Sequence, residues 1–205
     1  YDITQRKQTE QTLQLNQERY ALAVSAGKTG VWDWNVYTND LYLDPSLKAL
    51  LGYSDTELPN RLEVWMSLIH PDDVEPVRIA SRDYLQQRIP RFEVEHRLRH
   101  KDGSPRWMIV RGTAMHDERG RPYRMIGTNT DITERKAIEE RLHEQDRLLR
   151  GVTQVTHTLL TNPNNEKAIK TALEILGRIT AVDRVYLFEN HIVPETGEIV
   201  INQRF

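Results

Sequence analysis

The sequence predicts an α+β domain in which helices cover one face of a five-stranded antiparallel sheet. Extended segments come as a pair before residue 45 and as a group of three after residue 90, with short helical segments between them. Residues 91–100 alternate apolar and charged side chains, as a strand with one buried face does. Asp102 and Gly103 follow and form a strong two-residue hairpin signal. This order of elements favours antiparallel strands with the helices segregated to one side.

The N-terminal part of the chain predicts a long helix followed by two strands. Residues 4–27 are polar with spaced apolar side chains, which indicates a helix with one weakly apolar side. Residues 31–36 and 41–43 are short and apolar-rich, and a polar four-residue turn joins them. The two strands are therefore expected to pair with each other.

Three helix starts are predicted between the two groups of strands. The Asp-Pro pair at residues 44–45 combines a capping carboxylate with a proline suited to the first helical turn, and this helix is expected to end at Gly52. Residues 54–57 read Ser-Asp-Thr-Glu, the spacing of a capping box, which predicts a second start. Pro71 opens a third helix, with acidic residues in its first turn, that is expected to run to about residue 87.

The three later strands are expected at residues 91–100, 106–116 and 123–130. The middle one is apolar on both faces, with Trp107 and Ile109 on one side and Met108, Val110 and Ala114 on the other. A sheet with one solvated face does not show this pattern. We therefore expect the outer face to be covered by the helix at residues 4–27, by a partner chain, or by both.

A long helix is expected from Thr133 to about Leu160. Positions at 4-3 spacing form what we call the seam: Ile138, Leu142, Gln145, Leu149, Val152, Thr156 and Leu159. Five of these seven are aliphatic, so the helix is either a coiled-coil strand or a surface helix lying on its own domain. A further helix at residues 166–180, strands at 184–190 and 198–203, and a turn at 194–197 complete the chain.

One short motif occurs twice, 129 residues apart. Residues 2–7 read Asp-Ile-Thr-Gln-Arg-Lys and residues 131–136 read Asp-Ile-Thr-Glu-Arg-Lys. A fixed period of this kind indicates modules arranged in an array. Asp131 is expected to cap the following helix with Glu134 as its capping-box partner, while Thr133 bonds back to the sheet.

The motifs together carry a family resemblance over roughly residues 18–142. They are the Trp-Asp-Trp-Asn run at 32–35, His-Pro-Asp-Asp at 70–73, Phe-Glu-Val-Glu-His-Arg at 92–97, Lys-Asp-Gly-Ser at 101–104, Arg106 with Trp107, Gly127 and the Asp-Ile-Thr motif. The set resembles a PAS sensory domain of the fold-3 subfamily, with its C-terminal PAC motif, as found in bacterial multi-sensor signalling proteins. The PAS fold implied by this resemblance agrees with the α+β class predicted above.

Residues 173–177 read Leu-Glu-Ile-Leu-Gly, residues 183–191 read Asp-Arg-Val-Tyr-Leu-Phe-Glu-Asn-His, and residues 195–197 read Glu-Thr-Gly. With these motifs, residues 173–205 resemble the opening of a GAF domain, of which only the first part is present. The expected organisation follows from the two resemblances. Residues 1–24 are the end of a preceding PAS/PAC unit with its linker helix, and residues 25–132 are a PAS domain. Residues 133–160 are a coiled-coil linker helix, and residues 161–205 are the N-terminal, truncated α/β part of a GAF domain. The chain begins within the repeated motif, so we expect it to be a piece of a longer protein.

The composition restricts the function classes. A net charge of −2 with interspersed signs argues against a nucleic-acid partner. There is no run of 18 apolar residues and no visible signal peptide, so we expect no membrane contact in this chain and a cytoplasmic location. The absence of cysteine agrees with that location and excludes thiolate metal sites.

The histidines do not predict a metal site. His96 and His100 share a strand face about 13 Å apart. His143 and His157 are about 21 Å apart on one helix. Both separations are too long for one tetrahedral ion, whose ligand atoms lie ~2 Å from the metal. His157 also lacks the acidic neighbour of a phospho-accepting histidine, so we interpret it as an ordinary linker residue.

The candidate ligand pocket lies between the predicted sheet and the helices at residues 45–87. We assign Trp34, His96, Met108 and Asn129 to it. His96 lies on the apolar face of its strand between Val94 and Leu98, where relatives carry an aromatic residue. It is interpreted either as a core side chain bonded to a neighbour or as a ligand contact. Trp32 and Trp34 alternate with Asp33 along the first strand, so both are expected on one face of the sheet. For these two side chains, too, packing in the core is the alternative to contact with a ligand.

No cofactor is identified. A cysteinyl-flavin sensor needs a cysteine, and a haem-binding PAS domain takes its axial histidine from the long helix, where residues 72–88 have none. The chain has no catalytic motif. We expect the sensory and relay region of a sensor histidine kinase, with a diguanylate cyclase as the alternative parent. It senses a small ligand, or it is a ligand-free dimerisation and relay module.

The expected relay runs from the sheet into the linker helices. We assign six residues to it: Asp131, Ile132, Thr133, Ile138, Leu142 and Leu149. The first three form the joint between the last strand and the helix, and the last three belong to the seam. A homodimer through the linker helices is the expected partner arrangement.

Overall fold

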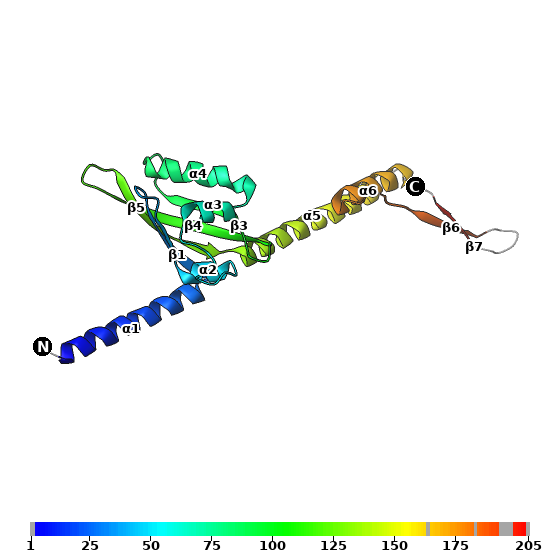
Figure 1. Ribbon diagram of the computed structural model, residues 1–205. Helices are drawn as coiled ribbons and strands as arrows, with labels where there is room; N and C mark the ends of the chain where they lie inside the picture. The colour runs from blue at the N-terminus through cyan, green and yellow to red at the C-terminus, as the bar shows by residue number, and fades with distance from the viewer. Residues whose placement is uncertain (1–2, 163–164, 183, 193–198, 204–205) are drawn as a thin grey trace. The chain divides into compact units, whose positions relative to one another are not determined.

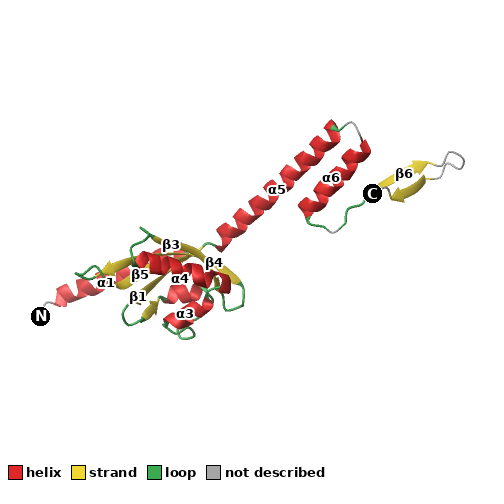
Figure 2. Ribbon diagram, turned by 90° about the horizontal axis from the view of Figure 1, so that it is seen from above, coloured by secondary structure: helices red, strands yellow, loops and turns green. Residues whose placement is uncertain are grey.

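The computed structural model describes residues 3–162, 165–182, 184–192 and 199–203, which fall into two units, residues 1–136 and 137–205. The first unit holds the helices and strands that precede α5 (Thr133–Thr161), together with the first turn of α5 (Figures 1 and 2). The elements before α5 are α1 (Ile3–Ala26), β1 (Thr29–Asn35), β2 (Leu41–Leu43), α2 (Pro45–Leu50), α3 (Leu62–Leu68), α4 (Pro71–Leu85), β3 (Phe92–Arg99), β4 (Pro105–His116) and β5 (Pro122–Asp131). In the described part of the chain, no helix has the length and apolar character that a membrane span requires.

The five strands form one antiparallel sheet in the order β2-β1-β5-β4-β3. The α+β class and the five-stranded sheet predicted from the sequence are therefore confirmed. Residues directly opposite each other share a face, so Trp32 lies opposite Gly127, which lies opposite Gly112, which lies opposite Phe92. This row crosses the inner face of the sheet.

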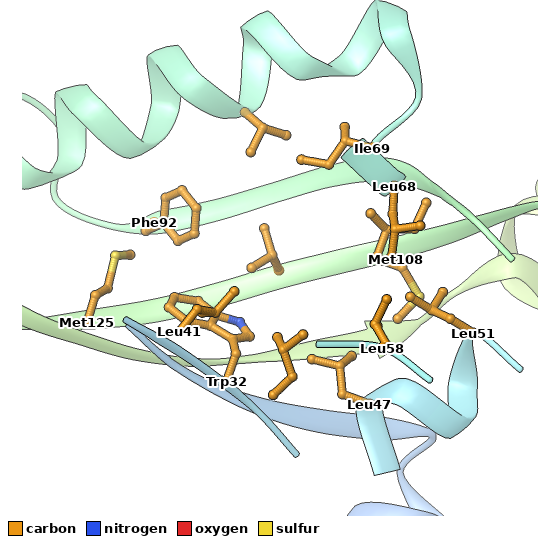
Figure 3. Packing of buried hydrophobic residues seen from close by; sticks show 14 residues of the cluster. Trp32, Leu41, Leu47, Leu51, Leu58, Leu68, Ile69, Phe92, Met108 and Met125 are labelled. Carbon is orange, nitrogen blue, oxygen red and sulfur yellow. The ribbon is translucent and has the colours of Figure 1, made fainter. Parts of the chain in front are cut away.

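The hydrophobic core lies between this inner face and helices α2, α3 and α4 (Figure 3). Its most deeply buried aliphatic side chains are Leu43, Leu47, Leu51 and Leu98, together with Met108 and Met125. Full burial of one such side chain contributes about 1.5–3 kcal/mol to folding. The alternation predicted for β3 is confirmed, since Phe92, His96 and Leu98 are buried.

Local sequence explains where two of the helices begin. The Asp44 carboxylate caps α2 by accepting a hydrogen bond of 2.8 Å from the Ser46 backbone N–H, as predicted. Helix α4 begins at Pro71 as expected, and His70 is its N-cap residue. Its Nδ1 atom accepts from the Asp72 backbone N–H at 3.4 Å.

The helix start predicted at Ser54 is wrong, because α3 begins only at Leu62. The backbone N–H of Ser54 does donate to the Glu57 carboxylate, at 2.9 Å, but the pair closes a turn instead of opening a helix. Pro59 explains the difference, since proline disfavours helical geometry at the residue before it and so stops a helix within one turn.

Within the described residues of the first unit, one end of the outer face of the sheet is covered. Glu95 lies opposite Ile109 on this face and forms ion pairs with Arg135 and Lys136, so the first turn of α5 covers Ile109, which is 7% exposed. Ile126 and Met115, farther along this face, are exposed.

Helix α1 is one of the two covers predicted for the outer face, and it does not cover this face in the single chain; cover by a partner chain stays a prediction. Helix α1 is attached to the domain by Val24, which is buried, and by the Tyr20 hydroxyl, which donates to Asp44 at 3.2 Å. Its side chains at Leu13, Leu15 and Leu22 remain exposed in the single chain.

The second unit contains most of α5, α6 (Asn165–Thr180) and a hairpin of β6 (Phe188–Ile192) and β7 (Ile199–Gln203). Helix α6 buries Ala168, Ala172 and Ile175. The Ile179 side chain packs closely on Gly151 of α5, since a Cβ atom added to Gly151 would lie only 1.9 Å from Ile179 Cδ1. Strand β6 begins four residues later than the strand predicted at residues 184–190. The turn predicted at residues 194–197 lies outside the described residues.

The aliphatic members of the seam on α5 are exposed within the single chain: Ile138, Leu142, Leu149, Val152 and Leu159. The contact with α6 uses Gly151, which lies on another side of the helix.

Candidate functional site

A cavity of about 770 Å³ lies between the inner face of the sheet and helices α3 and α4. Its walls are predominantly apolar and rich in aromatic side chains: Trp32, Trp34, Val36, Leu41, Leu62, Trp65, Met66, Ile69, Val77, Leu85, Phe92, Val110, Pro122 and Met125. Ligand pockets for small organic molecules have this size and this apolar character.

Trp32 lies across the sheet because two glycines leave room for its indole. A Cβ atom on Gly127 would approach a Trp32 ring carbon to 2.2 Å, and one on Gly112 would approach the ring to 2.8 Å. Any side chain at either position would therefore displace the ring. The ring also packs edge-to-face on Phe92, with centroids 6.5 Å apart, and the two form part of the cavity wall.

Four polar side chains of the cavity wall carry buried atoms without a hydrogen-bond partner among the described residues. These atoms are Trp32 Nε1, Trp34 Nε1, both ring nitrogens of His96, and both amide atoms of Asn129. His96 is 2% exposed and Asn129 is 1% exposed. Leaving such a group unsatisfied costs about 1–3 kcal/mol, so native proteins rarely gather several in one place.

The His96 imidazole is uncharged near neutral pH. Burial lowers its pKa below the usual range, because the low-dielectric interior disfavours the charged form. The backbone carbonyl of Val94 and the charge of Asp73 offset part of this shift. The carbonyl does not meet hydrogen-bond geometry, so both ring nitrogens stay available, one as a donor and the other as an acceptor.

The charged residues of the cavity wall are exposed and lie at its rim. They are Glu63, Arg78 and Arg82, accompanied by Ser81 and Gln86. Arg78 pairs with Glu75 at 3.4 Å and Arg82 with Asp83 at 3.6 Å. The interior of the cavity is therefore polar at a few points but uncharged.

Three of the four pocket residues assigned from the sequence are on the cavity wall, namely Trp34, His96 and Asn129. Met108 is fully buried in the hydrophobic core, directly opposite His96 on the next strand. The sequence reasoning did not assign Trp32 to the pocket. Two glycines on opposite positions of paired strands are a signal for close packing that could have identified it.

A second set of contacts joins the sheet to α5, and we call residues 131–133 the joint. The Asp131 carboxylate accepts a hydrogen bond of 2.8 Å from the Thr133 backbone N–H. The Thr133 hydroxyl oxygen accepts one of 3.0 Å from the Trp107 backbone N–H, and the Ile132 N–H donates to the Trp107 carbonyl at 2.8 Å. Both hydrogen bonds predicted for Asp131 and Thr133 are present.

Glu134 does not complete a capping box. Its carboxylate accepts a hydrogen bond of 3.0 Å from Lys28 Nζ, so it joins the start of α5 to the segment between α1 and β1. The Asp131 N–H also donates to the Lys28 carbonyl at 2.9 Å. The end of α1 and the start of α5 therefore meet at the joint.

Strands β5 and β3 connect the cavity wall to the joint and to the first turn of α5, respectively. Asn129 on the cavity wall comes two residues before Asp131 in β5. His96 on the wall is next to Glu95 in β3, whose pKa is lowered by hydrogen bonds from Lys136 and Arg135. On the outer face the Trp107 ring contacts two cations, Arg97 and Lys136, at 5.4 and 5.3 Å from its centroid.

Comparison with known proteins places this arrangement in a class of sensory domains. Residues 40–129 match the family model PAS_3, described as PAS fold. The structure is similar to the crystal structure of a sensory box histidine kinase/response regulator from Burkholderia thailandensis E264. That similarity has 41% identity and a TM-score of 0.57, and it covers 64% of this chain and 98% of that chain. The chain belongs to the PAS-fold family.

Curated relatives are signalling proteins of much greater length. The probable diguanylate cyclase DgcE of Escherichia coli K12 is 34% identical over 148 residues, which are 72% of this chain and 13% of the relative. The methanogenesis regulatory histidine kinase FilI of Methanothrix harundinacea is 34% identical over 91 residues, 44% of this chain and 10% of the relative. The chain thus spans about a tenth of the length of these relatives, and its PAS domain is homologous to domains of sensory signal-transduction proteins.

Proposed function

We propose that the PAS domain of this chain is a sensor that binds a small molecule in the cavity and relays occupancy to α5. One observation carries the proposal, namely the buried polar atoms of Trp32, Trp34, His96 and Asn129 without partners on the wall of a large cavity. A bound molecule with matching groups would remove the desolvation cost of those atoms.

The relay is proposed to run through the joint. A molecule bonded to Asn129 or His96 acts on β5 or β3, the strands that connect directly to the joint and to the Glu95 ion pairs. A shift of either strand would alter the hydrogen bonds at Asp131 and Thr133. The relay residues assigned from the sequence would then carry the shift, first Ile132 in the joint and then Ile138, Leu142 and Leu149 on the seam.

The parent protein is proposed to be a multi-domain sensor histidine kinase of a two-component system, with a diguanylate cyclase as the alternative. The histidine kinase and diguanylate cyclase relatives support these two effector types. We also propose that the chain is cytoplasmic and non-catalytic, and that it begins with the end of a preceding PAS/PAC unit. Residues 161–205 would form the first part of a GAF domain, which the helix α6 and the β6–β7 hairpin support.

A second candidate function is a dimerisation and relay module that needs no ligand. The exposed aliphatic side chains of the seam favour it, because such a row on a long helix is typical of a surface that pairs with a second copy. In this case the polar atoms of the cavity would be satisfied by water and α5 would transmit changes that arise in α1.

The test separates the two candidates by whether the cavity takes up a molecule. Purified protein is extracted with acidified solvent, and the extract is analysed by mass spectrometry. In parallel the protein is screened against a metabolite library by thermal shift. A ligand that binds only the folded state raises the melting temperature, so the sensor proposal predicts at least one saturable stabilising compound.

A matched pair of variants on α4 locates the binding. Ser81→Phe places a bulky side chain at the cavity, while Ile79→Phe adds the same ring at an exposed position outside it. The sensor proposal predicts that Ser81→Phe loses the thermal shift and Ile79→Phe keeps it. An empty extract together with no stabilising compound would leave the ligand-free module as the function.

A further inference from the structure

We propose that the cavity selects an uncharged, flat ring compound that carries two or more carbonyl oxygens. This inference rests on the proposed function, because it requires that the cavity bind a small molecule. It goes beyond that function by naming the chemical class of the molecule. Three properties of the cavity lead to this class, namely its charge, its balance of hydrogen-bond donors and acceptors, and the shape of its walls.

The charge of the cavity excludes an ionic group from its interior. The two most deeply buried polar residues of the wall, Asn129 and neutral His96, carry no charge. An ion placed beside them would lose its hydration without gaining a partner of opposite charge, at a cost of several kcal/mol. The charged side chains of the wall are confined to the exposed rim, where Arg78 and Arg82 already pair with acidic neighbours.

The buried polar atoms present more donors than acceptors. Each indole nitrogen can only donate, the Asn129 amide nitrogen carries two donors, and the neutral His96 ring has one donor and one acceptor. The Asn129 oxygen is the remaining acceptor. A molecule that satisfies this set must therefore supply several acceptors, and carbonyl oxygens are uncharged acceptors that need no donor of their own.

The walls favour a flat ring over an aliphatic chain. Four aromatic side chains line the cavity, and Trp32 and Phe92 already pack edge-to-face. A ring compound can stack on such walls with a gain of about 0.5–1.5 kcal/mol per pair beyond area burial. His96 and Asn129 lie on β3 and β5 with β4 between them, which separates their backbones by roughly 10 Å. A ring with carbonyls on opposite edges could therefore accept one hydrogen bond from His96 and another from Asn129.

The experiment compares four probes on the whole chain by isothermal titration calorimetry. Duroquinone is a fully methylated ring with two opposed carbonyls, and durene has the same methylated ring without them. Trimethylbenzoate adds a charge to a similar ring, and decanoate is an apolar chain with a carboxylate that could reach Arg78 and Arg82. The chain has no cysteine, and every ring position of duroquinone is substituted, so adducts do not complicate the comparison.

We expect duroquinone to bind at least about tenfold more tightly than durene, because one or two hydrogen bonds to buried neutral groups contribute factors of this size. In Asn129→Leu this preference is expected to fall about threefold or more, while durene binds as well as before or better. Trp34→Phe removes one hydrogen-bond donor and keeps an aromatic wall, and it is also expected to reduce the preference for duroquinone over durene. Ile79→Leu changes an exposed apolar residue outside the cavity and is expected to leave the preference unchanged.

Each alternative result has a distinct meaning. Equal binding of durene and duroquinone, or tighter binding of trimethylbenzoate or decanoate, would overturn the ligand class but leave the cavity as a binding site. Failure of all four probes to bind up to their solubility limits would also overturn the ligand class. The proposed function is decided separately, by the extract and library screen, so the two failures are distinguishable. If Asn129→Leu does not fold, the preference of the unmodified chain and of Trp34→Phe still decides the question.

Discussion

The backbone N–H of Trp107 donates a hydrogen bond of 3.0 Å to the Thr133 hydroxyl, so the first residue of α5 is tied to strand β4. The Trp107 carbonyl accepts a hydrogen bond from the Ile132 N–H, and the Trp107 ring contacts the Arg97 and Lys136 cations. The start of α5 is therefore fixed to the sheet by backbone and side-chain contacts together. Any shift of β4 or β5 must be accommodated at this point.

Removal of the Asp131 carboxylate is expected to destabilise the PAS domain. Asp131→Ala deletes the acceptor of the Thr133 N–H and should cost about 0.5–2 kcal/mol, as the loss of a helix cap does. Urea denaturation followed by circular dichroism measures this cost. Asp131→Asn keeps a side-chain oxygen and is expected to lose much less. An Asp131→Ala variant as stable as the parent would show that the contact has no energetic role.

The sequence predicted the sheet well because each strand has a local pattern. The alternation of residues 92–99, the hairpin signal of Asp102 and Gly103, and the Asp44 cap each involve residues close in the chain. The absence of a helix at Ser54 could not be foreseen from the capping spacing alone. The Glu57 carboxylate, which accepts from the Ser54 N–H, also accepts a hydrogen bond from Lys101, and that contact between residues 44 positions apart is not visible in the local spacing.

The cavity could be predicted only in part from the sequence. His96 was identifiable because it interrupts an apolar face, and Trp34 because it alternates with a charged residue. The role of Trp32 depends on Gly112 and Gly127, which come together only through the strand register. Two hydrogen bonds likewise join chain segments more than 100 residues apart. The Asp131 N–H donates to the Lys28 carbonyl, and Lys28 Nζ donates to the Glu134 carboxylate.

The two glycines beneath Trp32 are expected to differ in their tolerance of alanine. A Cβ on Gly127 would come within 2.2 Å of the Arg111 carbonyl oxygen as well as the Trp32 ring. The nearest atoms to a Cβ on Gly112 would belong to the Trp32 and Met125 side chains, at 2.8 and 2.9 Å, and side chains can move. Overpacking typically costs about 1–3 kcal/mol, so we expect Gly127→Ala to reach the upper end or beyond and Gly112→Ala to cost less. Equal or reversed urea midpoints would contradict the account of the indole position.

Acid is expected to weaken the contact between α4 and β3. The Asp73 carboxylate accepts hydrogen bonds from the Arg97 side chain and backbone, which lower its pKa to about 2. Because the folded-state pKa is below the ordinary value of about 4, the stabilisation is present above pH ~4 and is lost as the pH falls toward 2. Urea unfolding at a series of pH values should show a shallower acid dependence for Asp73→Asn than for the parent. An unchanged slope would assign the acid sensitivity to other groups.

The seam is expected to mediate a parallel homodimer, together with residues 4–24 of α1. Leu149→Glu places a charge in the seam and should shift the chain toward monomer in light scattering at tens of micromolar concentration. Leu160→Glu is the matched control, because Leu160 is also exposed but lies outside the 4-3 spacing. A parent chain that is monomeric at these concentrations, or a control that dissociates equally, would contradict pairing through the seam.

The central claim is that occupancy of the cavity changes the joint between the sheet and α5. Amide hydrogen exchange of residues 131–142, measured with and without the most stabilising library compound, tests it most directly. The account predicts altered exchange in this segment on binding, and a smaller change in Thr133→Val, which lacks the acceptor for the Trp107 N–H. Exchange within α6 serves as the internal control. A compound that binds in the cavity yet leaves exchange of residues 131–142 unaltered would contradict the account.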